Sequence, residues 1–177
     1  MAILYAFEAQ SIQAFIFATG KLREMVGASE IVEELCQGLL DRSLRALTPD
    51  KHEILYQAAG GARIQFHDDA SADTFMRYWP LIVSRHAPGL GLVQAKAPAS
   101  DPDALQKLVD ELRVQRSFTK PELPETTPPM QTNPRTGQAA EARERGEALE
   151  PALVLKRKAA ARANNRMTGV IAPEHND

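Results

Sequence analysis

The chain has 177 residues, a formal net charge of −2 at pH 7, a hydrophobic fraction of 44% and one cysteine. The near-neutral balance argues against a general nucleic-acid-binding surface, and a single cysteine excludes an internal disulfide or a zinc ribbon made by this chain alone. No apolar run approaches the ~20 residues of a membrane-spanning helix, and the N-terminus lacks a signal-peptide pattern. We therefore expect a cytoplasmic protein with one compact domain and an appendage.

The N-terminal segment predicts a strand, a short helix and a basic loop. Residues 3–7 form an apolar run that Glu8 closes, and the apolar spacing of 12–17 is that of one buried helical face. Such a strand–helix unit beside a basic loop suits a phosphate site, but many plain strand–helix units look the same and no phosphate-loop signature is present. The loop is marked by two glycines that flank a basic pair, namely Gly20, Lys21, Arg23 and Gly27.

The following residues predict further helices and strands as far as residue 118. A helix with an apolar stripe is expected over 28–47, and Gly60-Gly61 between two apolar runs predicts a hairpin, because glycine reaches the positive φ values of tight turns. Proline within the next helix predicts a kink. The remaining expected elements are a helix after Asp68 that Pro80 interrupts, a strand over 90–97, and a helix that begins at Asp101-Pro102.

This order of elements predicts an α+β, ferredoxin-like fold with one extra helix after the first strand. Right-handed crossovers place the first and third strands side by side in an antiparallel sheet. Glu8 and the Gly60-Gly61 turn then share one end of the sheet, whereas Asp68 and Asp69 lie roughly 23 Å away at the other end. These aspartates cannot join Glu8 in one metal site.

The character of the chain changes after residue 118. Five prolines fall between Pro121 and Pro134, and large apolar residues are almost absent until Leu149. We interpret 119–177 as a Pro-rich, then charged C-terminal arm that is extended or partly helical and solvated, whose removal should leave the domain 1–118 stable. The alternative is an arm that docks on a partner or on nucleic acid.

Three segments, SIQAFIF, KLREMVGAS and YQAAGGARIQF, resemble the palm domain of the large subunit of type III CRISPR effector complexes. The resemblance covers about residues 3–118, and the run from Ile12 to Phe17 is its most specific part. That palm is similar to the nucleotide cyclases and the GGDEF diguanylate cyclases. In the family it converts ATP into cyclic oligoadenylates with two metal ions, held by an acid at the end of the first strand and by acids in a Gly-Gly-Asp-Asp hairpin tip. The resemblance therefore implies a nucleotide-cyclase-type palm.

The sequence departs from the family pattern at the metal site. Gly60 and Gly61 match the two glycines and Glu8 takes the place of the first-strand acid, but Ala62 and Arg63 stand where the aspartates belong. Paired Mg²⁺ ions need several oxygen ligands, and an arginine there repels a cation. We therefore expect no bound metal, and the sequence assigns no cofactor. The resemblance would imply ATP with Mg²⁺ only if the catalytic site were functional.

Other candidate residues have two interpretations each. Lys21 and Arg23 could contact phosphates or be ordinary exposed bases, and Arg63 could contact a phosphate, although an ion pair with Glu8 or with a partner is favoured. The resemblance implies a small polar residue near the nucleotide base at Ser29, for which a helix cap is the alternative. The stretch 133–137 resembles the segment where the family often has zinc-binding cysteines, but it contains none.

The leading hypothesis is a catalytically degenerate palm subunit of a type III CRISPR-like antiviral assembly. It would pack against a second palm, as a homodimer or with another palm-bearing chain, and would bind nucleotide or RNA. The predicted strands are apolar on both faces, which is typical of a sheet that is buried on both sides, and a second palm would cover the free face. One alternative is an active nucleotidyltransferase whose acids are completed by a partner palm, and the other is a ferredoxin-like RNA-binding module.

Overall fold

The computed structural model describes residues 1–58, 60–118 and 131–171, with side chains as far as residue 164. The chain forms two compact units. The first is the described part of Met1–Ile12 and Val32–Pro121, and the second is Gln13–Ile31 with the described part of Glu122–Asp177. This division differs from the expected boundary after residue 118, because Gln13–Ile31 is grouped with the C-terminal residues.

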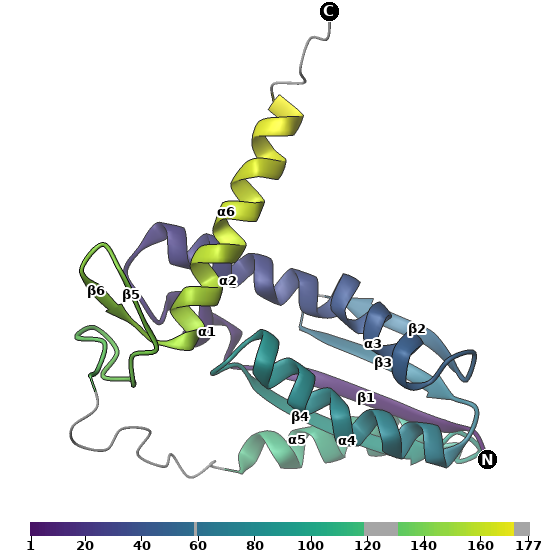
Figure 1. Cartoon of the computed structure of the whole chain (residues 1–177). Coiled ribbons are helices and arrows are strands. Elements are labelled where there is room, and N and C mark those ends of the chain that lie inside the picture. Colours follow the sequence, from purple (N-terminus) through teal and green to yellow (C-terminus); the bar gives the residue numbers. More distant parts are fainter. Residues whose placement is uncertain (59, 119–130, 172–177) are drawn as a thin grey trace, which may run out of the picture. The chain divides into compact units, whose positions relative to one another are not determined.

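The first unit contains a four-stranded antiparallel sheet (Figure 1). The strand order is β2-β3-β1-β4, so the first and third strands are central, as the sequence predicts. This arrangement confirms the ferredoxin-like α+β fold. The strands are β1 (Ile3–Gln10), β2 (His52–Ala58), β3 (Gly61–Phe66) and β4 (Gly91–Pro98).

The helices match the predicted order but differ in their bounds. Residues 22–27, expected as a loop, are helical, and Gly27 lies inside α2. Pro80 does not interrupt its helix, which runs continuously through it. No helix in the described ranges is long and apolar enough to cross a membrane. The helices as far as residue 118 are α1 (Ile12–Phe17), α2 (Leu22–Glu34), the π-helix η1 (Leu35–Leu39), α3 (Leu40–Leu47), α4 (Asp69–His86) and α5 (Ala104–Ser117).

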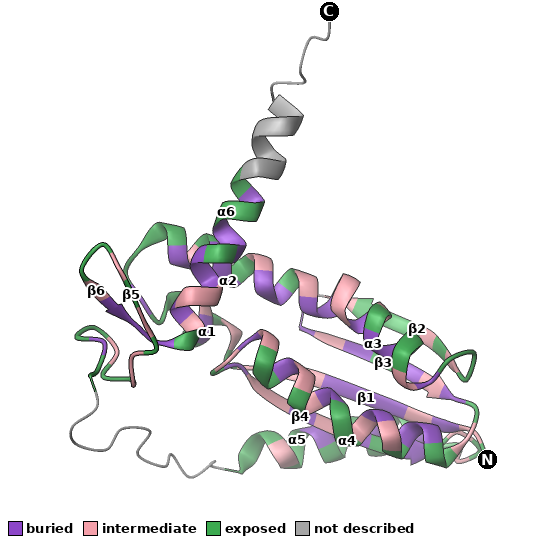
Figure 2. Cartoon of the chain, viewed as in Figure 1, coloured by how far each residue is buried: buried purple, intermediate pink, exposed green. Residues whose placement is uncertain are grey.

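One face of the sheet packs on α4 through an aromatic core. Phe7 and Trp79 have ring centroids 5.1 Å apart, and Tyr5 and Phe75 meet edge to face at 5.5 Å. Burial raises the pKa of Tyr5, whose hydroxyl donates to Gln94 Oε1 at 2.8 Å. The aromatic rings between this face and α4 are at most 1% exposed, and Figure 2 shows β1 largely in the purple of buried residues. This core fixes β1 and therefore the position of its last residues.

The opposite face of the sheet packs on α5. Ala6 alternates with the core aromatics along β1 and points the other way, where Leu108 and Leu112 of α5 cover it together with alanines and Val93 of β4. Strands β1 and β4 are therefore buried on both faces within one chain. This finding explains most of the two-sided apolar pattern that favoured a second palm.

The second unit contains a short hairpin and a long helix. These are β5 (Ala142–Glu144), β6 (Glu147–Leu149) and α6 (Pro151–Ile171). The region expected as a solvated arm contains the helix α6, in which Leu153, Ala159 and Ala160 are buried. Small residues permit close packing here, since a Cβ on Gly27 of α2 would lie 1.7 Å from the Lys156 carbonyl oxygen of α6.

Candidate functional site

The register of the sheet places Glu8 beside the hairpin tip. Glu8 pairs with Gly61 on β3 and Phe7 pairs with Ala62, whereas Ile3 at the other end of β1 pairs with Phe66. Because Asp68 and Asp69 follow Phe66, they lie at the end of the sheet away from Glu8. The sequence prediction of this separation is confirmed.

Both glycines of the tip are required by packing alone. Gly60 has φ +92°, and a Cβ there would lie 2.6 Å from Ile12 Cδ1. A Cβ on Gly61 would lie 2.8 Å from the carbonyl oxygen of Phe7. The tip is also held by the Gly60 N–H, which donates to the buried Cys36 Sγ at 3.2 Å, and burial raises the pKa of that thiol. The glycine pair therefore has a structural role whether or not a metal binds.

A pocket of about 280 Å³ opens at the tip. Tyr56, Arg63 and Glu8 supply its polar groups, while Ile12 and Leu112 supply apolar surface. Its complete lining comes from β1, the start of α1, the hairpin and α5, namely Ala6, Phe7, Glu8, Ala9, Ile12, Tyr56, Ala58, Gly60, Gly61, Ala62, Arg63 and Leu112. The pocket combines one carboxylate with a cation and an aromatic ring.

The expected ion pair between Arg63 and Glu8 is not formed. Glu8 instead pairs with Arg116 of α5 at 3.4 Å, and both side chains are well exposed, so the pair adds little stability. The guanidinium of Arg63 lies 5.9 Å from the ring centroid of Tyr56, within cation–π range. Ala62 is 3% exposed and brings no ligand atom from its side chain.

The other candidates, Lys21, Arg23 and Ser29, belong to the second unit. Lys21 Nζ donates to Glu147 at 2.8 Å, and Arg23 lies 3.6 Å from Glu144. Ser29 is exposed inside α2, so it does not cap a helix. A role of these residues toward a nucleotide stays a prediction.

Sequence reasoning missed a buried charge network in the second unit. Glu24 is fully buried and accepts from Arg135 at 2.9 and 3.1 Å and from Arg157 at 2.8 and 3.0 Å. Arg157 also bonds to Glu144 at 3.0 Å and to Glu147 at 2.5 Å. Burial alone would raise the pKa of Glu24, but these hydrogen bonds outweigh it and lower the pKa to about 2.

The cysteine-free stretch 133–137 is organised by hydrogen bonds. Asn133 Nδ2 and Thr136 Oγ1 both donate to Glu150 Oε2, at 2.7 and 2.9 Å. Glu150 precedes α6, and its carbonyl oxygen accepts from Leu153 at 3.1 Å. Within the described part of the chain, no group of three or more His, Cys, Asp or Glu side chains could hold a metal ion.

No protein-family model and no curated protein matches the chain. Among solved structures, the Csm1–Csm4 cassette in complex with AMPPNP matches with a TM-score of 0.50 at 18% identity, over 65% of this chain and 18% of that chain. The cassette in complex with cA3 matches with a TM-score of 0.50 at 17% identity, with the same coverage. Csm1 in T. onnurineus matches with a TM-score of 0.47 at 17% identity, over 69% of this chain and 20% of that chain.

The chain has the palm fold found in Csm1. It spans only about a fifth of the length of the chains that it matches, and identity this low establishes the fold alone. Activity, ligands and partners therefore depend on the chain's own residues.

Proposed function

We propose that this chain is a palm-fold subunit of a type III CRISPR-like antiviral assembly that lacks metal-dependent catalysis of its own. It packs against a second palm and holds a nucleotide or RNA beside its hairpin tip. The Csm1-like fold supports the setting, and the occurrence of Csm1 with Csm4 in the matched cassettes supports a role inside a complex. The residues of the hairpin tip support the absence of metal-dependent catalysis.

The observation that carries this proposal is the tip sequence Gly60-Gly61-Ala62-Arg63 opposite Glu8. Two-metal phosphoryl chemistry requires several carboxylates that clamp both ions. Among the described residues, Glu8 is the only carboxylate that lines the pocket, and it is already paired with Arg116. Arg63 adds a positive charge on the same surface, which opposes binding of a second cation.

The same residues suit an anionic aromatic ligand without a metal. Tyr56 is 56% exposed and offers a ring for stacking, while the guanidinium of Arg63 offers donors to a phosphate. The matched Csm1–Csm4 cassettes were solved in complex with AMPPNP and with cA3, which supports a nucleotide-like ligand as the one to test here. The pocket at the tip is where we expect such a ligand in this chain.

The RNA-recognition alternative is less favoured by the same geometry. Such a module stacks bases on exposed aromatics of its central strands, but Tyr5, Phe7 and Phe66 are at most 1% exposed. The exposed Tyr56 lies on the edge strand β2 instead. The central strands thus offer no aromatic stacking platform.

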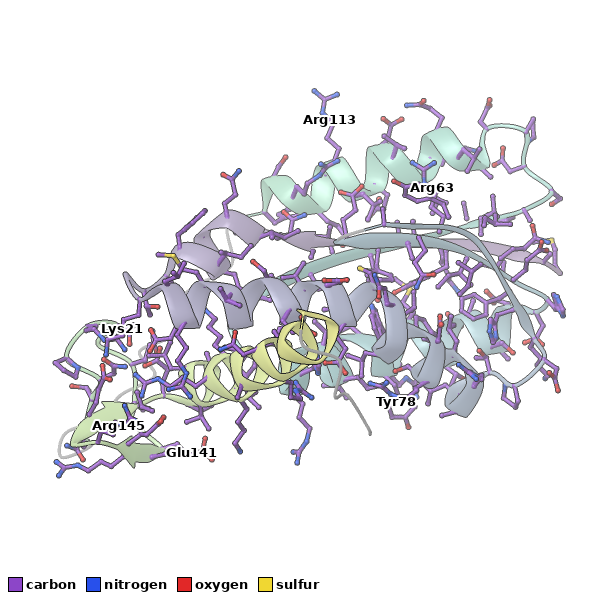
Figure 3. The ribbon with its side chains drawn as sticks, turned by 90° about the horizontal axis from the view of Figure 1, so that it is seen from above. Lys21, Arg63, Tyr78, Arg113, Glu141 and Arg145 are labelled. Atoms are coloured by element: carbon purple, nitrogen blue, oxygen red, sulfur yellow. The ribbon has the colours of Figure 1, made fainter. Side chains whose placement is uncertain are left out.

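Incubation of the purified chain with ATP or GTP and Mg²⁺ or Mn²⁺ tests the proposal directly. We expect no cyclic or linear oligonucleotide by chromatography and mass spectrometry. A product that disappears in Glu8→Ala would overturn the proposal and establish the partner-completed nucleotidyltransferase. Binding of a fluorescent ATP analogue in EDTA tests the ligand, and we expect it to weaken in Arg63→Ala but not in Arg113→Ala, an exposed arginine on α5 (Figure 3).

A further inference from the structure

The second unit contains a pocket of about 270 Å³ whose lining is entirely charged. Three glutamates and four cations line it, and the cations are Lys21, Arg23, Arg145 and Arg157. A fifth cation, Arg135, bonds to two of these glutamates. Positive charge therefore exceeds negative charge around this pocket.

The three glutamates are paired mainly with the less exposed Arg157 and Arg135. The more exposed cations of the pocket therefore keep hydrogen-bond donors that no glutamate uses. Arg157 alone bonds to all three glutamates and is only 9% exposed at its side chain. Arg23 lies 3.6 Å from Glu144, beyond hydrogen-bond distance, and its side chain is 49% exposed. Lys21 makes one hydrogen bond and is 50% exposed. Arg23 and Lys21 can thus still donate to a ligand.

Arg145 is held at this pocket in an unfavourable backbone conformation. It occupies the two-residue turn between β5 and β6 with φ +51°, followed by Gly146 at φ +82°. Turns of this kind strongly prefer Asn or Gly at the first position, because other side chains are strained there. Arg145 is exposed, and its charge helps to lower the pKa of the neighbouring Glu144 without a close ion pair among the described residues. A long-range attraction between exposed charges adds little to stability, so ligand binding explains a strained arginine at this tip better than folding does.

We propose that Lys21, Arg23 and Arg145 bind the phosphodiester backbone of a nucleic acid without reading its bases. Guanidinium groups match phosphate oxygens as paired donors. No aromatic residue from the described part of the chain lines the pocket, so this lining offers bases no ring to stack on. A protein partner is less well matched, because the centres of protein interfaces are apolar and depleted of charge, whereas nucleic-acid interfaces are polar and positively charged. The site lies in a different unit from the hairpin tip and does not depend on the function proposed above.

Fluorescence anisotropy of the full chain with labelled 20-nucleotide oligo(U) RNA and oligo(dT) DNA tests this site between 50 and 200 mM salt. Three phosphate contacts predict a slope of log K against log salt of about −2, at roughly −0.7 for each contact to a single strand. Arg145→Asn should weaken binding several-fold and bring the slope to about −1.4. RNA and DNA should bind within a few-fold of each other, and a strong preference for either would contradict backbone recognition.

Arg113→Asn, on α5 of the first unit, is the matched control, since it removes the same charge from an exposed position (Figure 3). It should bind as the parent chain does, and an equal loss in both variants would overturn the site. Arg145→Asn should unfold at the same or a higher temperature, because Asn accepts a positive φ. A poly-glutamate peptide that binds as tightly as RNA would overturn the proposal in favour of an acidic protein partner.

Discussion

The carboxylate of Glu24 has no exposed surface, yet it accepts hydrogen bonds from two guanidinium groups. Its replacement by glutamine removes the fully buried one of the two carboxylates that Arg135 and Arg157 share, and leaves the more exposed Glu147 as their common partner. Breaking a buried pair in this way costs about 3–5 kcal/mol. We expect Glu24→Gln to lower the free energy of unfolding by that amount in urea at pH 7. Glu141→Gln, at an exposed position of the same unit, should change it by less than about 0.5 kcal/mol (Figure 3).

The same carboxylate predicts a loss of stability in acid. The pKa of Glu24 is about 2 in the folded chain and about 4.5 when unfolded, so its contribution is present above pH 4.5 and is lost as the pH falls toward 2. The contribution is roughly 3 kcal/mol for a shift of this size. Thermal unfolding from pH 7 to pH 2 should show this loss in the parent chain. The acid-dependent loss should be smaller in Glu24→Gln, and an identical pH dependence in both chains would contradict the assignment.

Sequence alone could place the candidate site but not its ion pairs. Strand directions brought Glu8 to Gly60 and Gly61, since alternation and register depend only on local pattern. The partner of Glu8 is Arg116, from a helix ninety or more residues later whose packing face the sequence did not specify. Glu24 was missed because Gly27 was interpreted as a loop residue, although Glu24, Ala28 and Ile31 have the spacing of one buried helical face.

At the scale of elements, Gly27 tests the packing of α2 on α6. Alanine normally stabilises a helix by about 1 kcal/mol over glycine. Here its Cβ would lie 1.7 Å from the carbonyl oxygen of Lys156, so the two helices must separate. We expect Gly27→Ala to lower the melting temperature by several degrees in circular dichroism. Gly20→Ala, where no atom lies within 4 Å of the new Cβ, should leave it nearly unchanged.

The elements of the second unit were the least predictable. Strands β5 and β6 have three residues each, too few for an alternating pattern to be recognised. Arg145-Gly146 was the one available turn signal, but arginine is unusual at its first position. Lys156 illustrates a second difficulty. It is 2% exposed and donates to the Phe15 carbonyl at 2.5 Å, but nothing in the sequence distinguishes it from a lysine on the surface.

At the scale of the molecule, the packing inside the second unit leads us to a new expectation about truncation. The sequence predicts that removal of 119–177 leaves the remainder stable. This cut removes Arg135 and Arg157, which bond to the buried Glu24. It also removes helix α6, which packs against Gly27 of α2. We expect a chain cut after Phe118 to melt more than ~5 °C lower than the full chain in calorimetry. An unchanged melting temperature would restore the interpretation of a dispensable arm.

Association with a second palm depends on the part of the sheet face that α5 leaves uncovered. Helix α5 covers β1 and β4, but over β2 and β3 the same face carries Arg63 and the 56% exposed Tyr56. Leu55, in an irregular part of the edge strand, is 46% exposed beside them. We expect this surface, next to the Gly60-Gly61 tip, to pack against a second palm. A stable interface buries about 800 Å² on each partner.

Light scattering at micromolar concentration should therefore give about twice the 19.5 kDa of one chain, or a complex with another palm-bearing chain. Tyr56→Asp places a carboxylate inside the proposed contact and should return the chain to a monomer. Tyr78→Asp is the matched control, because Tyr78 is 46% exposed on α4, on the opposite side of the sheet (Figure 3). A parent chain that is monomeric, with no palm-bearing partner recovered from cells, would contradict association, since this surface would then be a free face.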